Sequence, residues 1–426
     1  MNKVRALLTL IFAFTLFVQC QSTSNQKSII NLNHLNYLYT WLKVDGQPWA
    51  GIAIYAEYPD YHYLEAPGEG LICVDDIARA TIVYLRHAQY YKSTDSAVRA
   101  RQLIRTLLKM QASNGCFYNF IDSQGQIQKQ LKNSKPLPDW WTWRATWALA
   151  EFLKNDPSAT PSLKDSAEQA VQKVLPHVEM LNQNLNQWQE VAGFKLPVWL
   201  PQRHAADQAG LLIKALCALH AATGQPKLLP LIKAQARGLM SMQIKYSTSE
   251  FYGAFLSWQN IWHAYGNIQA DALLDAFEVT GDSAFFYSAL LEIDHFYPEL
   301  MKTGLLHQAK LKNENGKIIV TEKRQFEQIA YDLRPMIWAA LHAFKLTKQA
   351  KYGKLTLRLA SWFSGNNAAQ KAMYDAQSGR CFDGLITPEQ VNLNAGAEST
   401  IEALLALMEV ERVPELRKEL LEQFFE

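Results

Sequence analysis

The chain has 426 residues, of which 49% are hydrophobic and 19% are charged. This composition excludes an intrinsically disordered protein and predicts a large buried core. The 42 lysine and arginine residues nearly balance the 40 aspartate and glutamate residues, which leaves a formal net charge of +2. Because nucleic-acid binding needs a basic surface, this balance argues against a nucleic-acid partner.

The N-terminus has the pattern of an export signal. Lys3 and Arg5 precede an apolar run over residues 6–18, which has the length of a signal-peptide core and is too short to span a bilayer. A cysteine and a polar stretch follow directly, as in a bacterial lipoprotein signal. The alternative is an ordinary signal peptide cut nearby. We therefore expect a signal peptide over residues 1–19, a lipid on Cys20 that binds the membrane, a polar tether over 20–33, and a location in the bacterial periplasm or at the cell surface.

The remaining cysteines give no sign of a metal site. They are far apart, with no C-x-x-C spacing and no histidine close by, so we expect no zinc site and no cofactor. The chain also lacks the H-E-x-x-H, G-x-S-x-G and Walker A motifs. The sequence leaves open whether disulfide bonds join any of the four remaining cysteines, which are Cys73, Cys116, Cys217 and Cys381.

Six segments rich in alanine and leucine recur along the chain at steps of 61 to 66 residues. Each is apolar around most of its helical circumference, which predicts a helix buried on both sides. More polar helices with one exposed stripe lie between them, for example over residues 99–111 and 164–181. The buried segments begin at Asp76, Trp141, Asp207, Asp271, Asp332 and Glu398.

Six buried helices that alternate with outer helices close into a ring. We therefore predict an all-α fold, an (α/α)6 toroid of six helical hairpins with minor short strands in loops. The toroid is expected to form a single domain over residues 34–426. The sixth outer helix is either residues 414–425 or the segment near 34–42.

Parallel buried helices place all six of their N-termini around one opening. Five of the six first residues are acidic. A single aspartate or glutamate there stabilises a helix N-terminus. Five carboxylates around one opening also raise one another's pKa, which a purely stabilising role does not require. We therefore expect a functional pair among these acids.

Two carboxylates in a wide pocket lined by aromatic side chains are typical of glycoside cleavage. One protonates the departing oxygen, and the other activates water or attacks the sugar. Tryptophans in loops before the buried helices offer stacking faces, whereas Trp147 and Trp338 are expected in the core. Arginines near the acids either pair with them or bind an acidic sugar. The candidate substrate-binding residues are Asp75, Arg79, Trp140, Arg144, Trp199, His204, Trp258 and Tyr331.

Two motifs then resemble an uncharacterised helical group of the six-hairpin glycosidase superfamily. Residues 69–80 contain the C-x-D-D-x-A-R-A pattern of that group, and residues 392–400 contain its N-x-N-x-G-A-E-S-T pattern. The resemblance implies a carbohydrate ligand. Unsaturated glucuronyl hydrolases of the superfamily use an aspartate in each of two successive hairpins, and the nearest matches here are Asp76 and Asp139. The candidate catalytic residues are therefore Asp76, Glu398, Asp207, Asp332 and Asp139.

The sequence favours an exported glycoside hydrolase that acts on an oligosaccharide or polysaccharide fragment. Its mechanism would be general acid and base catalysis by carboxylates, with Asp76 and Glu398 from the two neighbouring motif-bearing helices as the leading pair. One alternative is a uronic-acid lyase or epimerase, in which Tyr331 or His204 abstracts a proton. Another alternative is a non-catalytic glycan-binding lipoprotein.

Overall fold

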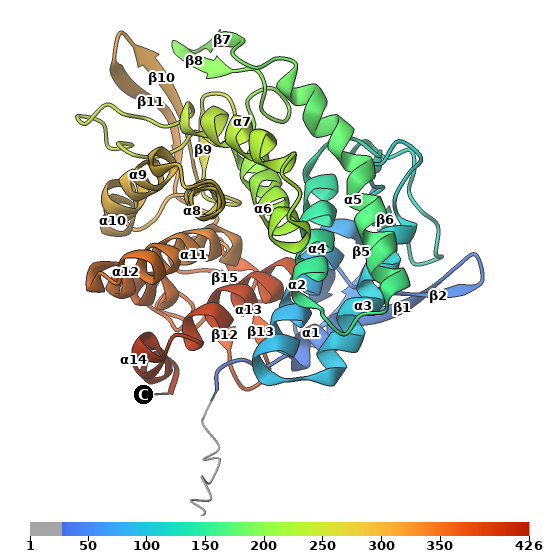
Figure 1. Cartoon of the computed structure of the whole chain (residues 1–426). Coiled ribbons are helices and arrows are strands. Elements are labelled where there is room, and N and C mark those ends of the chain that lie inside the picture. Colours follow the sequence, from blue (N-terminus) through green and yellow to red (C-terminus); the bar gives the residue numbers. More distant parts are fainter. Residues whose placement is uncertain (1–27, 426) are drawn as a thin grey trace, which may run out of the picture.

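Residues 28–425 are described by the structure, a computed structural model. Six inner helices surround a centre in Figure 1, and the outer helices lie outside them. Each inner helix packs against the next one along the chain, and the last packs against the first. This closure confirms the (α/α)6 toroid. The inner helices are α2 (Val74–Tyr91), α4 (Trp140–Asn155), α6 (Ala206–Thr223), α8 (Gln269–Thr280), α11 (Ala330–Thr347) and α13 (Ala397–Glu411).

The outer helices pair with the inner helices to form six hairpins. The sixth outer helix follows α13 and packs against α12 and α13, which decides between the two candidates left open by the sequence. The segment near residue 34 instead forms a short helix, α1 (Asn33–Leu38). The outer helices are α3 (Thr94–Lys109), α5 (Pro161–Asn182), α7 (Leu228–Met240), α9 (Ser283–Leu291) with the π-helical η2 (Glu292–Phe296) and α10 (Tyr297–Lys302), α12 (Ala350–Ala360) and α14 (Pro414–Phe425).

Short strands occupy the connections, as predicted. All the paired strands are antiparallel. The pairs are β1 (Tyr39–Val44) with β2 (Gln47–Ile52), β3 (Tyr55–Glu57) with β4 (His62–Leu64), β5 (Ile72–Cys73) with β6 (Phe120–Ile121), β7 (Trp188–Val191) with β8 (Phe194–Pro197), β12 (Tyr374–Asp375) with β13 (Arg380–Cys381), and β14 (Gly384–Leu385) with β15 (Val391–Asn392). One sheet has three strands, in the order β11 (Lys317–Arg324), β10 (Gln308–Glu314) and β9 (Ile261–His263). A short 3-10 turn, η1 (Lys132–Ser134), precedes α4.

Residues 28–33 pack along the ring. Ile29 is fully buried, and its N–H donates to Glu411 Oε2 at 2.9 Å. His34 Nε2 lies 2.8 Å from the carbonyl oxygen of Ala395. Because Ala395 precedes α13 and Glu411 ends it, this segment follows α13 along its length. The predicted tether therefore extends no further than residue 27, and the predicted signal peptide over 1–19 and Cys20 lie outside the described residues.

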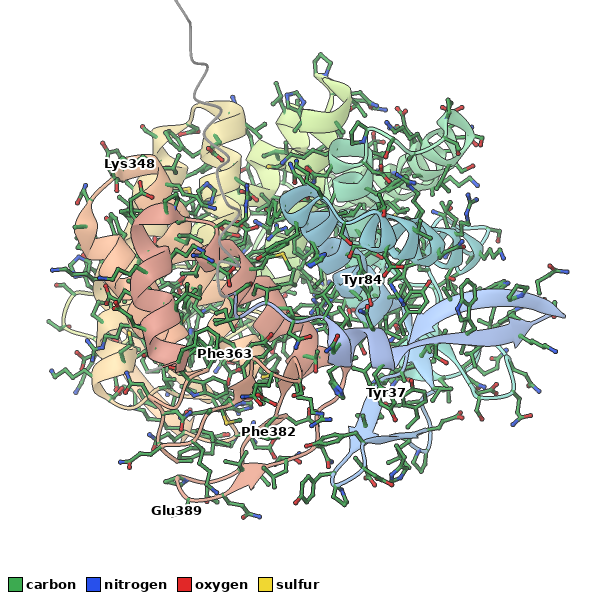
Figure 2. The ribbon with its side chains drawn as sticks, turned by 90° about the horizontal axis from the view of Figure 1, so that it is seen from below. Tyr37, Tyr84, Lys348, Phe363, Phe382 and Glu389 are labelled. Carbon is green, nitrogen blue, oxygen red and sulfur yellow. The ribbon has the colours of Figure 1, made fainter. Side chains whose placement is uncertain are left out.

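The N-terminal elements stay on the same side of the ring. Tyr84 on α2 donates to Asn36 Oδ1 of α1 at 3.0 Å. Figure 2 shows Tyr84 and Tyr37 on the side where the N-terminal strands lie. Within residues 28–425, no helix combines the length and apolar character that a membrane crossing requires.

We call the opening at the N-terminal ends of the inner helices the mouth, and the opening at their C-terminal ends the base. The fourth inner helix begins below the mouth, because α8 has 12 residues whereas α6 and α11 have 18. Asp271 of α8 pairs at 2.5 Å with Lys214, which lies two turns beyond Asp207 on α6. The expectation that Asp271 shares an opening with Asp207 is therefore wrong. Asp271 instead lines a pocket at the base with Arg86 and Glu409.

A buried ionic network closes the ring between its first and last helices. Arg79 on α2 donates through Nη1 to Glu402 Oε1 at 3.1 Å and to Glu398 Oε2 at 2.9 Å, both on α13. Its Nη2 donates to Asp76 Oδ1 at 2.6 Å. Arg334 on α11 donates through Nε to Glu402 Oε2 at 2.5 Å. Burial alone would raise the pKa of Glu402, but Arg334 and Arg79 outweigh it and lower that pKa.

The same network reaches the second hairpin. Arg144 on α4 pairs through Nε with Asp75 Oδ1 at 2.5 Å and donates through Nη2 to Tyr331 Oη on α11 at 2.5 Å. The guanidinium groups of Arg79, Arg144 and Arg334 all lie within 5.4 Å of the centre of the Tyr331 ring. Four of the six inner helices are therefore joined through charged groups shielded from water.

Removing Arg79 should strongly destabilise the fold. We expect Arg79→Met to lower the free energy of unfolding by about 3–5 kcal/mol, because Asp76 would remain buried without its ion pair and Glu402 would keep only Arg334. Urea denaturation measures this effect. The exposed pair of Lys418 and Glu422 provides the control, and Lys418→Met should leave the unfolding free energy nearly unchanged. An Arg79→Met protein as stable as the wild type would contradict a structural role for the network.

Candidate active site

One pocket of about 480 Å³ lies at the mouth, within the size range of small-molecule sites. Its walls come from the start of α4, the start of α6, and a loop over residues 253–268 that precedes α8. None of its lining residues is lysine or arginine. They are Asp139, Trp140, Gln202, Ala205, Asp207, Gln208, Trp258, Ile261, His263, Tyr265 and Gln308.

Asp139 is the first of two carboxylates in this pocket. It is the N-cap of α4, and its Oδ1 accepts the N–H of Trp140 at 2.8 Å. The same oxygen accepts from Gln208 Nε2 at 3.0 Å, while Trp143 Nε1 donates to Gln208 Oε1 at 3.0 Å and orients that amide. Burial raises the pKa of Asp139, and the nearby charge of Asp207 acts in the same direction. The hydrogen bonds from Trp140 and Gln208 oppose this rise without cancelling it.

Asp207 is the second carboxylate, and it forms a pair with His263. Asp207 Oδ1 accepts the N–H of Gln208 at 2.6 Å, and His263 Nε2 lies 3.0 Å from Asp207 Oδ2. His263 Nδ1 lies 2.7 Å from the carbonyl oxygen of Tyr265, which can only accept, so Nδ1 carries a hydrogen. The contact of Nε2 with Oδ2 therefore fixes the orientation of the Asp207 carboxyl group in the pocket.

Aromatic side chains form the remaining surface of the pocket. Trp258 is 40% exposed and Trp140 is half-buried, so both offer a ring face to a ligand. Tyr265 stacks on His263 with 3.8 Å between the ring centres. Gly266 has φ +66°, and a Cβ there would lie 2.7 Å from Tyr331 Oη and 3.3 Å from the Trp140 ring. Only glycine lets the loop approach these two side chains so closely.

Two residues predicted to bind substrate belong to the scaffold instead. Trp199 is 2% exposed, and its Nε1 donates to the carbonyl oxygen of Ala234 on α7 at 3.0 Å. His204 is also buried, and its ring nitrogens contact the carbonyl oxygen of Pro197 and the amide of Gln189. Neither offers a free surface to a ligand. Both were placed near the mouth because they precede α6, but the β7–β8 hairpin covers them.

The leading catalytic pair of the sequence analysis is also corrected. Asp76 and Glu398 are brought together, as predicted, but through Arg79, which lies between them. Asp76 does not line the mouth pocket, whereas Asp207 does, and the Oδ1 of Asp76 is held by Arg79. Burial raises its pKa to about 6, although Arg79 opposes that shift. Glu398 remains on the rim of the mouth, where its side chain is 44% exposed.

The other site residues that the sequence placed at the mouth are part of the packed interior of the ring. Asp332 is buried, and its Oδ2 accepts the N–H of Ile329 at the start of α11 at 3.0 Å. Burial raises the pKa of Asp332 well above its usual value. Asp75, Arg79, Arg144 and Tyr331 belong to the ionic network. The sequence analysis missed seven pocket residues that lie outside the helical periodicity or lacked a motif, namely Gln202, Ala205, Gln208, Ile261, His263, Tyr265 and Gln308.

Within residues 28–425, one trio of side chains could hold a metal ion, and it lies at the base. Asp271, Asp275 and His342 place their ligand atoms within 4.8 Å of one another. Lys214 Nζ already lies 2.5 Å from Asp271 and 2.6 Å from Asp275, so an ammonium group takes the place of a cation. Burial would lower the pKa of His342, but hydrogen bonds to Asp271 and Glu278 raise it to about 9. The three side chains therefore form an ionic cluster with Lys214, which has a structural role.

The four cysteines outside the N-terminal segment are buried and free, which removes the question of their pairing. They are Cys73, Cys116, Cys217 and Cys381.

No protein-family model matches the chain, and no curated protein matches it. Solved structures do. Cellobiose 2-epimerase from Bacillus thermoamylovorans B4167 is 16% identical with a TM-score of 0.58, over 85% of this chain and 92% of its own. A sugar epimerase from a ruminal bacterium is 12% identical with a TM-score of 0.61, over 91% and 97%. A family 76 glycoside hydrolase from a bovine Bacteroides thetaiotaomicron strain is 12% identical with a TM-score of 0.56, over 90% and 78%.

These neighbours share the fold of the chain over most of their length, in agreement with the (α/α)6 toroid predicted from the six repeated segments. Because the identities are low, the likeness establishes the fold and leaves the reaction to be argued from the site.

Two tryptophans allow the pocket to be separated from the core by mutation. We expect Trp199→Ala to lower the free energy of unfolding by about 3–5 kcal/mol, because it opens a cavity between the β7–β8 hairpin and α7. Trp258→Ala should cost less than about 1 kcal/mol, because the ring already faces solvent. Urea denaturation of both variants tests the assignment, and equal losses would contradict it.

Proposed function

We propose that the protein is a carbohydrate-active enzyme, and specifically a glycoside hydrolase that cleaves neutral oligosaccharides at the mouth pocket. The observation that supports this proposal is the meeting of Asp139 and Asp207, from two successive hairpins, with the half-exposed rings of Trp140 and Trp258 in one pocket. Paired carboxylates and stacking surfaces are what hydrolysis of a glycosidic bond needs. The sugar-processing enzymes that share the fold agree with this class of ligand.

In this proposal Asp139 is the general acid. Its raised pKa keeps a proton available for the departing glycosidic oxygen. Asp207 activates the water or attacks the sugar, and His263 holds its carboxylate in position. The amide of Gln208 lies between the two acids and hydrogen-bonds to Asp139. Trp140 and Trp258 stack on the sugar rings.

Two observations argue against the uronic-acid lyase or epimerase. Such chemistry needs a cation for the sugar carboxylate, but no lysine or arginine lines the pocket, and Arg79, Arg144 and Arg334 already pair with carboxylates. The two bases suggested for it are also engaged. Tyr331 Oη accepts from Arg144, and His204 is buried within the scaffold.

Replacing Asp139 should remove activity without unfolding the protein. We expect Asp139→Asn to lower turnover by about 10²–10⁴-fold, because the general acid is lost, whereas the thermal midpoint changes little because asparagine still caps α4. Turnover is measured on a panel of neutral and uronic oligosaccharides by mass spectrometry, where hydrolysis adds one water. In the wild type the rate should fall as the pH rises through the raised pKa of Asp139, because the acid form is then lost.

Asp76→Asn provides the matched control, because it changes a neighbouring buried acid that also begins an inner helix. This variant should melt at a lower temperature through loss of the ion pair with Arg79, yet it should keep its activity per folded molecule. Loss of activity in Asp76→Asn with full activity in Asp139→Asn would reverse the assignment. An unsaturated product without added water would identify a lyase, and bound but unchanged sugar would identify a glycan-binding protein.

We also propose that the protein is exported and anchored to the membrane through a lipid on Cys20. The support is the charged, apolar and cysteine-containing order of residues 3–20. Cys20→Ser should move the protein from the membrane fraction to the soluble fraction after cell lysis, while the thermal midpoint stays the same. A Cys20→Ser protein that remains in the membrane fraction would contradict lipidation at this residue.

A further inference from the structure

The loop over residues 253–268 carries four residues of the mouth pocket, namely Trp258, Ile261, His263 and Tyr265. On the pocket side it is fastened to α6, because the N–H of Asp207 donates to the carbonyl oxygen of Ser257 at 3.2 Å. The Ser257 hydroxyl also contacts the backbone of His263. The pocket side chains are positioned by these contacts, by the pairing of His263 with Gln308 between β9 and β10, and by what supports the loop from the outer helical layer.

A single carboxyl group contacts the loop from the outer helical layer. Glu292 is 0% exposed, and its Oε1 accepts the N–H of Phe255, near the start of the loop, at 3.1 Å. Its Oε2 accepts from Tyr297 Oη at 3.1 Å. The side chain of Asn267, near the end of the loop, lies close enough to influence the same carboxyl group, but it makes no hydrogen bond among the described residues.

Local backbone geometry directs Glu292 toward the loop. Glu292 begins η2, a π-helical turn between α9 and α10, and such turns displace side chains from the regular helical positions. Gly253 lies directly opposite with φ +89°, and a Cβ there would be 2.5 Å from the carbonyl oxygen of Leu291. The close approach of loop and helix at this point is therefore built into both segments.

No positive charge balances Glu292. None of the ion pairs within residues 28–425 includes it, and the titratable groups around it are Tyr297 on α10 and, beyond that ring, Asp271 on α8. Burial raises the pKa of Glu292 to about 8, even though Phe255 and Tyr297 favour its ionised form. At neutral pH the group is therefore mainly an uncharged carboxylic acid.

We propose that Glu292 is a positioning residue of the mouth pocket, which holds the start of the 253–268 loop through the N–H of Phe255 and thereby helps to set the places of Trp258, His263 and Tyr265. The value of these positions for catalysis rests on the proposed function, but the contact itself does not. Ionisation of Glu292 would place an unpaired charge behind the loop. Because its pKa is higher in the closed loop than in an exposed carboxyl group, near 4.3, closure is strongest below about pH 4.3 and weakens as the pH rises toward 8.

Hydrogen–deuterium exchange of the full chain tests the proposal without requiring turnover. After correction for intrinsic exchange, amides of residues 253–268 in the wild type should exchange at least about tenfold faster at pH 8 than at pH 5. In Glu292→Gln, which keeps an acceptor for Phe255 but cannot ionise, this pH dependence should disappear. In Glu292→Leu, which has no acceptor, the loop should exchange fast at both pH values. Peptides from α12 serve as an internal reference.

Glu411→Gln is the matched control, because Glu411 is also buried and accepts a backbone N–H, that of Ile29, in a different part of the ring. It should leave exchange in the loop unchanged. Equal pH dependence in the wild type and Glu292→Gln would overturn the proposal, and so would slow exchange in the Leu variant. If the Glu292→Leu variant does not fold, the comparison of the wild type with Glu292→Gln still tests the proposal. Failure of the hydrolase assay with the predicted exchange pattern would overturn only the proposed function.

Discussion

The buried contact between Arg79 and Glu402 is the interaction on which the rest of the ring depends. It joins the first inner helix to the last, at the point where a chain of hairpins must close on itself. Arg334 shares Glu402, and Arg144 binds Asp75 beside Arg79. Because buried charges are costly unless every partner is in place, this network favours the closed ring over open arrangements of the same hairpins. The stacking of three guanidinium groups around Tyr331 then brings α11 next to the Trp140 side of the mouth.

The network also divides the acidic residues of the mouth into two groups. Asp76 and Glu402 form ion pairs with Arg79, and Asp332 accepts a backbone N–H at the start of α11. Asp139 contacts Gln208 and Asp207 contacts His263, and no ion pair within residues 28–425 joins either acid to an arginine. These two acids therefore line the mouth pocket beside a scaffold whose charges are already balanced. The base of the ring follows a different pattern, because Lys214 and His342 neutralise its acids.

Helical periodicity predicted the toroid because burial on both faces leaves a clear signal in α2, α4, α6, α11 and α13. The repeats led to Asp207, the loops before the inner helices led to Trp140 and Trp258, and the resemblance to unsaturated glucuronyl hydrolases led to Asp139. The shortening of α8 was not predictable from its apolar pattern, which looks the same wherever the helix begins. His263 was missed because β9 has only three residues, and Tyr265 was missed because it lies in the connection after β9, where neither spacing nor periodicity marks a position. Trp199 was misassigned because the cover provided by the β7–β8 hairpin is a tertiary contact.

The central claim is that an oligosaccharide binds at the mouth between Trp258 and the two aspartates. A crystal structure of the Asp139→Asn protein soaked with a neutral tetrasaccharide tests it most directly. The account predicts a sugar ring stacked on Trp258. A glycosidic oxygen should lie within about 3 Å of the side chain at position 139, on the side of the pocket that Asp207 lines. A sugar bound at the base of the ring, or at the mouth with neither carboxylate position within hydrogen-bond reach of a glycosidic bond, would contradict it.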